Sequence, residues 1–220
     1  MSNVMSKEAA LDHCFEPREE FPKEYKPPGV YIRGGDLTEW KEADAIVHQC
    51  NCLAVTSHGL SAEIAHKYWW ADPYHHRKPE RRRNLAVKEH RAQPGSIQIM
   101  KNPQGKKPDV IILYAQWDFG VGDKYYRRVS DGYEDTYEER EKLFRQCLDE
   151  LGKCDQYQTL AFPYKIGCGL AGGNWENYLV MINDFTFKYK KDVTLVKKMF
   201  SKNYQTGYLL NDCVVCLLLQ

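Results

Sequence analysis

The sequence predicts an α/β domain of three layers, α/β/α, with helices on both faces of a central sheet. Two observations carry this prediction. Short apolar segments, the length of strands, alternate along the chain with longer segments in which apolar residues recur at helical spacing. Several of the short segments, residues 110–115 above all, are continuously apolar, which is typical of strands that are buried on both faces.

Each element follows from its local pattern. Strands are expected where apolar residues are continuous or alternate with polar ones, at 30–33, 45–49, 96–100, 110–115, 159–163 and 193–197. Helices are expected where apolar residues recur every three or four positions, at 59–70, 136–152 and 174–189. Thr136 and Asn174 stand at the start of the last two helices, and both residue types are favoured N-caps. The charged segment 72–83 and the glycine-containing segment 120–132 are expected to be loops.

The chain divides into three parts by composition. Residues 1–28 are charged and proline-rich and predict a flexible N-terminal arm, residues 29–198 form the domain, and residues 199–220 are a C-terminal extension. The apolar run 213–219 is far shorter than the roughly 20 residues that span a bilayer. Because the N-terminus shows no apolar run typical of a signal peptide, we expect an intracellular protein, cytoplasmic or nuclear, with no membrane partner.

Charge and cysteine content exclude several classes of function. Lys and Arg total 31 and Asp and Glu total 30, a net charge of +1, which argues against a protein that coats nucleic acid or membrane. The eight cysteines are irregularly spaced in a chain with no mark of secretion, so reduced thiols are expected. Cys213 and Cys216 have the spacing of a zinc-ligand pair, but no second pair completes the set. No metal site is expected.

A glycine-rich segment follows the predicted strand 159–163 and precedes a predicted helix. It contains Gly167, Gly169, Gly172 and Gly173. Glycine lets backbone N–H groups approach a ligand closely, and a helix N-terminus adds free N–H groups and a positive dipole. In open α/β sheets, ligands bind beyond the carboxyl ends of strands, which is where this segment lies. It therefore predicts an anion site, most often for phosphate, although it lacks both the Walker and the dinucleotide-binding patterns.

Further polar residues follow two other predicted strands. Asn51 comes at the end of strand 45–49, and its amide is suited to sugar hydroxyls. His48 is the imidazole at the same strand end, and it reads either as an acid–base group or as a buried structural histidine. Asp36 follows strand 30–33, where it either caps a turn or accepts a hydrogen bond from an exocyclic amine such as that of adenine.

Taken together, these segments resemble the macrodomain family of ADP-ribose-binding modules. The resemblance rests on the order and spacing of five segments, which span about residues 30–198: Gly35-Asp36-Leu37, Ile46-Val47-His48-Gln49-Cys50-Asn51-Cys52, residues 58–65, Pro94-Gly95-Ser96-Ile97 and residues 163–175. The resemblance implies a mixed, twisted central sheet between helices, ADP-ribose or a derivative as ligand, and neither metal nor cofactor.

The resemblance also implies a role for each matching residue. Asp36 would hold the adenine amine with Leu37 beside it, and Asn51 would bind the distal ribose. The diphosphate would lie between two loops, of which the first contributes His58, Gly59 and Ser61. The second contributes Ile166, Gly167, Cys168, Gly169, Leu170 and Ala171.

Macrodomains include both readers and hydrolases, so activity has to be argued from particular positions. One branch carries an Asp directly after Gly-Cys-Gly-Leu and a Lys on the preceding strand, whereas this chain has Ala171 and no Lys in 110–116. The branch of ADP-ribose 1″-phosphate phosphatases carries a His-x-Cys-Asn-Cys run, which residues 48–52 resemble. The first expectation is therefore phosphate removal, with His48 as acid, base or nucleophile and Asp118 as a second acid–base group.

Three alternatives stay open. The domain is a non-catalytic reader of free or protein-attached ADP-ribose, or it removes ADP-ribose from proteins with water held by the substrate phosphates. An RNA-binding surface is the third, because segments 75–83 and 125–128 interleave cations with aromatic residues. No RNA-binding motif accompanies those segments, so solvated loop charge is favoured and nucleic acid is not the expected partner.

Overall fold

The computed structural model describes residues 29–123 and 129–198. Within them lie three α-helices, α1 (Leu60–Lys67), α2 (Tyr137–Gly152) and α3 (Trp175–Tyr189). The strands are β1 (Val30–Gly34), β2 (Ala45–Asn51), β3 (Ile97–Met100), β4 (Asp109–Gln116), β5 (Thr159–Pro163) and β6 (Asp192–Lys197). The predicted arm 1–28 and extension 199–220 lie outside the described residues, so those two assignments stay predictions.

The strands form one mixed sheet in the order β1-β6-β5-β2-β4-β3. Neighbouring strands are parallel except β3, which runs antiparallel to β4. The exception has a simple cause: only residues 101–108 connect β3 to β4, too few for the crossover that a parallel pair requires. The predicted three-layer fold with a mixed sheet is confirmed.

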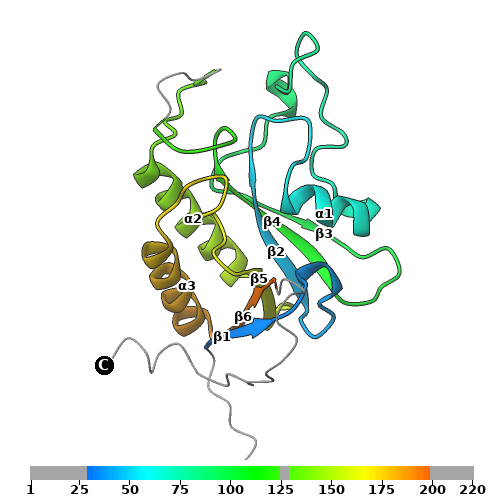
Figure 1. Ribbon diagram of the computed structural model, residues 1–220, viewed down its shortest axis with the longest axis vertical. Helices are drawn as coiled ribbons and strands as arrows, with labels where there is room; N and C mark the ends of the chain where they lie inside the picture. Colours follow the sequence, from blue (N-terminus) through cyan, green and yellow to red (C-terminus); the bar gives the residue numbers. More distant parts are fainter. Residues whose placement is uncertain (1–28, 124–128, 199–220) are drawn as a thin grey trace, which may run out of the picture.

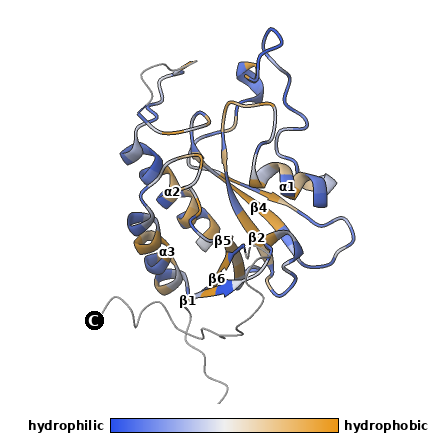
Figure 2. Cartoon of the chain, in the orientation of Figure 1, coloured by the Kyte–Doolittle hydropathy of each residue, from blue (hydrophilic) through white to orange (hydrophobic). Residues whose placement is uncertain are grey.

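Each face of the sheet has its own apolar core. Helices α2 and α3 cover one face, where Phe144 and Tyr178 pack with their rings 4.5 Å apart. Helix α1 covers the other face, where Ile64 packs near Ile46 and Val110. Figure 1 shows the two helices on one side and α1 on the other, and Figure 2 shows the apolar strands between them.

The helix ends follow the expected capping chemistry. The Thr136 hydroxyl accepts from the Glu139 N–H at 3.0 Å, and the Asn174 side chain accepts from the Glu176 N–H at 2.9 Å, so both predicted N-caps are confirmed. Helix α1 is shorter than predicted. It ends at Lys67 because Tyr68 leaves helical geometry (φ −121°, ψ 82°), and Trp69–Ala71 forms a separate 3-10 turn.

Among the described residues, no helix combines the length and the apolar character that crossing a membrane requires.

Candidate functional site

A cavity of about 560 Å³ opens at the carboxyl ends of β2, β4 and β5. One side is formed by residues 51–61, which we call the asparagine wall, and the opposite side by residues 163–171, the glycine wall. Most of the predicted ligand-binding residues line this cavity: Asn51, His58, Gly59, Ser61, Ile166, Gly167, Gly169, Leu170 and Ala171. The topology thus brings together two segments that are more than 100 residues apart in the sequence.

Asn51 shapes the asparagine wall with most of its hydrogen-bonding capacity. Its side-chain oxygen accepts from the N–H groups of Leu53 (3.2 Å) and Ala54 (2.7 Å). Its Nδ2 donates to the Tyr74 hydroxyl at 3.2 Å. An amide nitrogen carries two protons, so one N–H of the Asn51 side chain remains for a ligand. The sequence had suggested that both the oxygen and the nitrogen of this amide would be available.

The far end of the asparagine wall is the entrance to α1. The Ser61 hydroxyl donates to the His58 carbonyl at 2.9 Å and accepts from the His58 N–H at 3.2 Å, so it fixes the loop on itself. Gly59 has a left-handed φ of 57°, and no side chain caps the helix after it. The first N–H groups of α1 therefore stand at the cavity edge without a side-chain acceptor, which favours a bound anion.

The glycine wall contains one glycine that protein packing requires and one that it does not. Gly167 has φ 73°, and a Cβ built there would lie 2.4 Å from the Tyr178 ring and 2.7 Å from Oε1 of Gln49, so the fold itself demands glycine. Gly169 has no such conformation, and a Cβ there would meet no protein atom within 4 Å. Protein packing does not explain Gly169, whereas close approach of a ligand to the backbone would.

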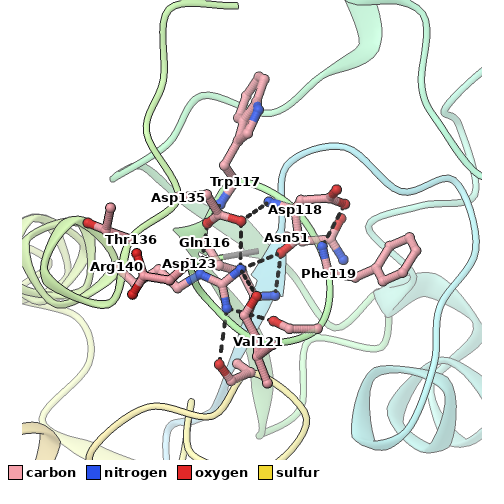
Figure 3. Close-up of polar contacts among 12 residues, drawn as sticks. Asn51, Gln116, Trp117, Asp118, Phe119, Val121, Asp123, Asp135, Thr136 and Arg140 are labelled. Carbon is pink, nitrogen blue, oxygen red and sulfur yellow. Dashed lines mark hydrogen bonds and ion pairs between the residues drawn. The ribbon is translucent and has the colours of Figure 1, made fainter. Parts of the chain in front are cut away.

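A buried ion pair holds the glycine wall in place. Arg140 is 2% exposed and forms two hydrogen bonds with Asp135, Nε to Oδ1 at 2.7 Å and Nη2 to Oδ2 at 2.6 Å. Its guanidinium also donates to the carbonyls of Gly120 (2.6 Å) and Ala171 (3.1 Å), which line the cavity. Figure 3 shows this guanidinium among the carbonyls it binds. The ion pair therefore fixes the β4–α2 loop against the glycine wall.

Arg140 was not among the residues predicted from the sequence. It lies on the apolar stripe of α2, three, four and seven residues before Leu143, Phe144 and Cys147. A cation on that stripe is a signal in itself, because a buried charge requires a partner.

The structure does not support the predicted catalytic role of His48. Its side chain is 1% exposed, it does not line the cavity, and its Nδ1 lies 3.5 Å from the Cys50 thiol. Burial lowers the pKa of His48 to about 4, so the imidazole is neutral at neutral pH. His48 lies on the same face of β2 as Ile46 and Cys50, and its side chain is buried. Of the two interpretations of this residue, the structure favours a buried structural histidine.

Asp118 is also placed away from the cavity lining. It is 5% exposed, and its Oδ1 accepts from the Phe119 N–H at 2.7 Å. Its carbonyl accepts from Arg140 Nη2 at 3.1 Å. Its observed contacts hold the β4–α2 loop, and the predicted acid–base role has no geometric support.

Asp36 and Leu37 lie outside the cavity lining as well. The Asp36 carboxylate accepts from the hydroxyl and the N–H of Thr38, both at 2.8 Å, and so caps a 3-10 turn. These hydrogen bonds, the hydroxyl foremost, hold the pKa of Asp36 below its usual value. Leu37 is buried in the core beneath α1. The predicted adenine-binding role of the two residues stays a prediction.

Cys168 is half-buried, and its thiol lies 3.2 Å from the Ile166 carbonyl, which accepts a hydrogen bond from it. Burial raises the pKa of Cys168 to about 11, so the thiol stays protonated at neutral pH and is a poor nucleophile. Cys168 makes its hydrogen bond within the glycine wall and does not line the cavity.

The described lining of the cavity contains one charged side chain, that of Lys165. Among the described residues that line it, none is Asp or Glu, whereas His58 and Lys165 are present. Lys165 has φ 60°, an unusual conformation for a residue with a side chain. The cavity therefore suits an anion and contains no carboxylate to act as a general base.

No family model matches this chain, and no curated protein matches it by sequence. Solved structures match it by fold. The macrodomain of Mycobacterium tuberculosis DarG gives a TM-score of 0.51 at 16% identity and covers 78% of this chain and 98% of that chain. A protein of unknown function from Bacteroides thetaiotaomicron gives a TM-score of 0.51 at 20% identity and covers 77% of this chain and 98% of that chain. The chain has the macrodomain fold.

Proposed function

We propose that the cavity binds ADP-ribose or a derivative of it, with the diphosphate between the asparagine wall and the glycine wall. The observation that carries the proposal is a cavity whose described lining contains Lys165 but no carboxylate, and which offers backbone N–H groups to an anion. A ligand can approach the backbone closely at two places, the open space at Gly169 and the uncapped start of α1. A volume of about 560 Å³ is in the range of small-molecule sites.

The remaining N–H of Asn51 is proposed to bind the distal ribose. The mouth of the cavity carries two exposed apolar side chains, Leu170 (76%) and Phe119 (42%). Such a rim suits contact with whatever carries the ADP-ribose, so an ADP-ribosylated protein is the proposed partner.

Binding without chemistry is the function favoured by this geometry. A hydrolase needs a group that activates water or takes part in proton transfer, and neither His48 nor Asp118 reaches the cavity. Phosphate removal from ADP-ribose 1″-phosphate is the second candidate. It is favoured by one observation, that His58 is an imidazole lining the cavity at the entrance to α1.

Calorimetric titration of the full chain tests the binding proposal. We expect ADP-ribose to bind with a micromolar dissociation constant, about −8 kcal/mol. AMP, which lacks the second phosphate and the distal ribose, should bind at least ten-fold more weakly. An adenine site at Asp36 predicts that ADP-ribose binds more tightly than its guanine counterpart. Equal heats for ADP-ribose and AMP would contradict the placement of the diphosphate between the walls.

Phosphate release from ADP-ribose 1″-phosphate separates the two candidate functions. A reader binds this compound and releases no phosphate during long incubation. If phosphate is released, we expect His58→Ala to abolish release and His48→Gln to leave it unchanged. Loss of release in His48→Gln, with binding intact, would restore the catalytic role of His48.

A further inference from the structure

A hairpin of residues 78–87 projects from the segment between α1 and β3. Its two sides are joined at Pro79 and Ala86, and the Glu80 N–H donates to the Leu85 carbonyl at 2.6 Å. The tip is a tight turn, closed by the Arg83 N–H on the Glu80 carbonyl at 3.0 Å. Three consecutive arginines, Arg81, Arg82 and Arg83, form this tip, and we call residues 78–87 the arginine hairpin.

The backbone at the tip is unusual. Arg81 has φ 48° and Arg82 has φ 59°, both in the left-handed region that favours glycine and asparagine. Placing two arginines there costs free energy that Asn-Gly would avoid. Unfavourable conformations of this kind are concentrated at functional sites, so the side chains themselves need an explanation.

Within residues 29–123 and 129–198, no carboxylate neutralises the charges of the tip. Among the described residues, none forms an ion pair with Arg81, Arg82 or Arg83. The adjacent Glu80 pairs instead with Arg91 at 3.0 Å. Residues 75–91 contain seven Lys or Arg and two Glu, a net +5, although the whole chain carries only +1. The Arg91 side chain is buried and also pairs with Asp131, so the basic surface of this segment is formed by the exposed cations Lys78, Arg81–Arg83 and Lys88.

A groove of about 390 Å³ adjoins the hairpin. Its lining includes His76, Arg77, His90 and Tyr114, together with one carboxylate, Glu89. The Lys78 N–H at the base of the hairpin donates to Nδ1 of His90 at 3.0 Å, so hairpin and groove are contiguous.

Arg77 adds a further cation to the lining of this groove. It has no ion pair among the described residues, and its buried Nη2 makes no hydrogen bond. The guanidinium lies over the rings of Tyr74 (4.6 Å) and Tyr114 (5.5 Å). Both tyrosine rings are buried and covered by this guanidinium, so the ring of the groove on which a nucleobase can stack is the exposed imidazole of His76.

We propose that the arginine hairpin and this groove bind single-stranded nucleic acid. Phosphates would pair with Arg81–Arg83, whose forked guanidinium groups match phosphate oxygens, and a base would stack on the exposed His76 imidazole in the groove. An acidic protein segment would satisfy the arginines but would leave the ring-lined groove without a matching group, so nucleic acid is favoured. This proposal goes beyond ADP-ribose binding and does not depend on it.

The hairpin is also fixed to the ADP-ribose cavity. The Asn84 side-chain oxygen accepts from the N–H groups of Val55 (2.9 Å) and Thr56 (3.0 Å), and Thr56 lines that cavity. A strand bound by the hairpin would therefore pass close to the cavity mouth.

Fluorescence anisotropy with a labelled dT12 oligonucleotide tests the proposal on the full chain, at 50 to 200 mM NaCl. The key variant is Arg81→Asn with Arg82→Gly, because Asn-Gly suits the left-handed turn and removes both charges without loss of fold stability. We expect its dissociation constant to rise at least ten-fold. The slope of log K against log salt should fall by about 1.4, the value for two lost phosphate contacts on a single strand. His76→Ala should weaken binding by a smaller factor.

The matched control is Lys41→Asn with Lys106→Asn, which removes two exposed charges elsewhere. It should bind dT12 like the wild type. The proposal is overturned if the wild type does not bind at 50 mM NaCl, or if the control loses as much affinity as the hairpin variant. It is also overturned if polyglutamate competes as well as unlabelled dT12, because the surface would then recognise acidic protein.

Discussion

The two walls of the cavity differ in what their own side chains do. In the asparagine wall, the Asn51 and Ser61 side chains bind backbone groups within three residues of themselves, and Arg77 and Asn84 add hydrogen bonds from outside the wall. The glycine wall has few side chains of its own to use, and its position depends on Arg140, which comes from another element. Polar side chains in a binding loop can thus serve the loop first and the ligand second.

Arginine contributes to both walls, but in different electrostatic settings. Arg77 donates from Nη1 to the carbonyls of Asn51, Cys52 and Ala54, at 2.8 to 3.2 Å, and no carboxylate in the described part of the chain forms an ion pair with it. Arg140 is paired with buried Asp135. The walls should therefore respond differently when the arginine is removed.

The largest expected effect is that of Arg140→Met. The substitution leaves Asp135 buried without its cation, and it should lower the free energy of unfolding by about 3–5 kcal/mol. Arg77→Met removes hydrogen bonds but strands no buried charge, so it should cost only about 1–3 kcal/mol. Urea denaturation of both variants measures the difference. Equal losses would show that the ion pair has no special part in holding the glycine wall.

Gly167→Ala should have the next largest effect. A Cβ would strike the Tyr178 ring and the Gln49 side chain, and φ 73° is unfavourable for alanine, so we expect a loss of about 1–3 kcal/mol. Differential scanning calorimetry would show this as a lower Tm. An unchanged Tm would mean that the glycine wall adapts more freely than its contacts indicate.

The burial of His48 in β2 predicts that the free energy of unfolding depends on pH. Its folded-state pKa of about 4 lies below the unfolded value of about 6.5, so the unfolded chain binds the proton more tightly. Stability from this group is complete above pH 6.5 and is lost as pH falls toward 4. We expect about 2 kcal/mol less stability at pH 5 than at pH 7, measured by urea denaturation. His48→Gln should show a correspondingly flatter pH profile, and an unchanged profile would place the pH dependence elsewhere.

Much of the fold could be predicted because the pattern that indicates each helix or strand lies within a short stretch of sequence. Continuous apolar runs identified β2 and β4, and Thr136 and Asn174 marked the starts of α2 and α3. The end of α1 was placed too late, because the apolar residues of Trp69–Ala71 continue the helical spacing although the backbone leaves the helix.

The cavity was predicted in outline because glycines and strand ends are visible in the sequence. What each polar side chain does there was less accessible. A histidine at a strand end has the same pattern whether it faces ligand or core, and His48 faces the core. The partner of Arg140 and the use of Asn51 in its own loop depend on contacts that spacing alone does not fix.

The most direct test of a diphosphate between the two walls compares affinity with stability in Gly169→Ala. Apart from its two chain neighbours, no protein atom lies within 4 Å of the added Cβ, so the Tm should stay unchanged while the affinity for ADP-ribose, measured by calorimetry, falls at least ten-fold. Gly105→Ala, at a turn with φ 65° near the opposite end of the sheet, should do the reverse, with lower stability and unchanged affinity. Wild-type affinity in Gly169→Ala would contradict the account, because the proposed diphosphate would leave no room there for a side chain.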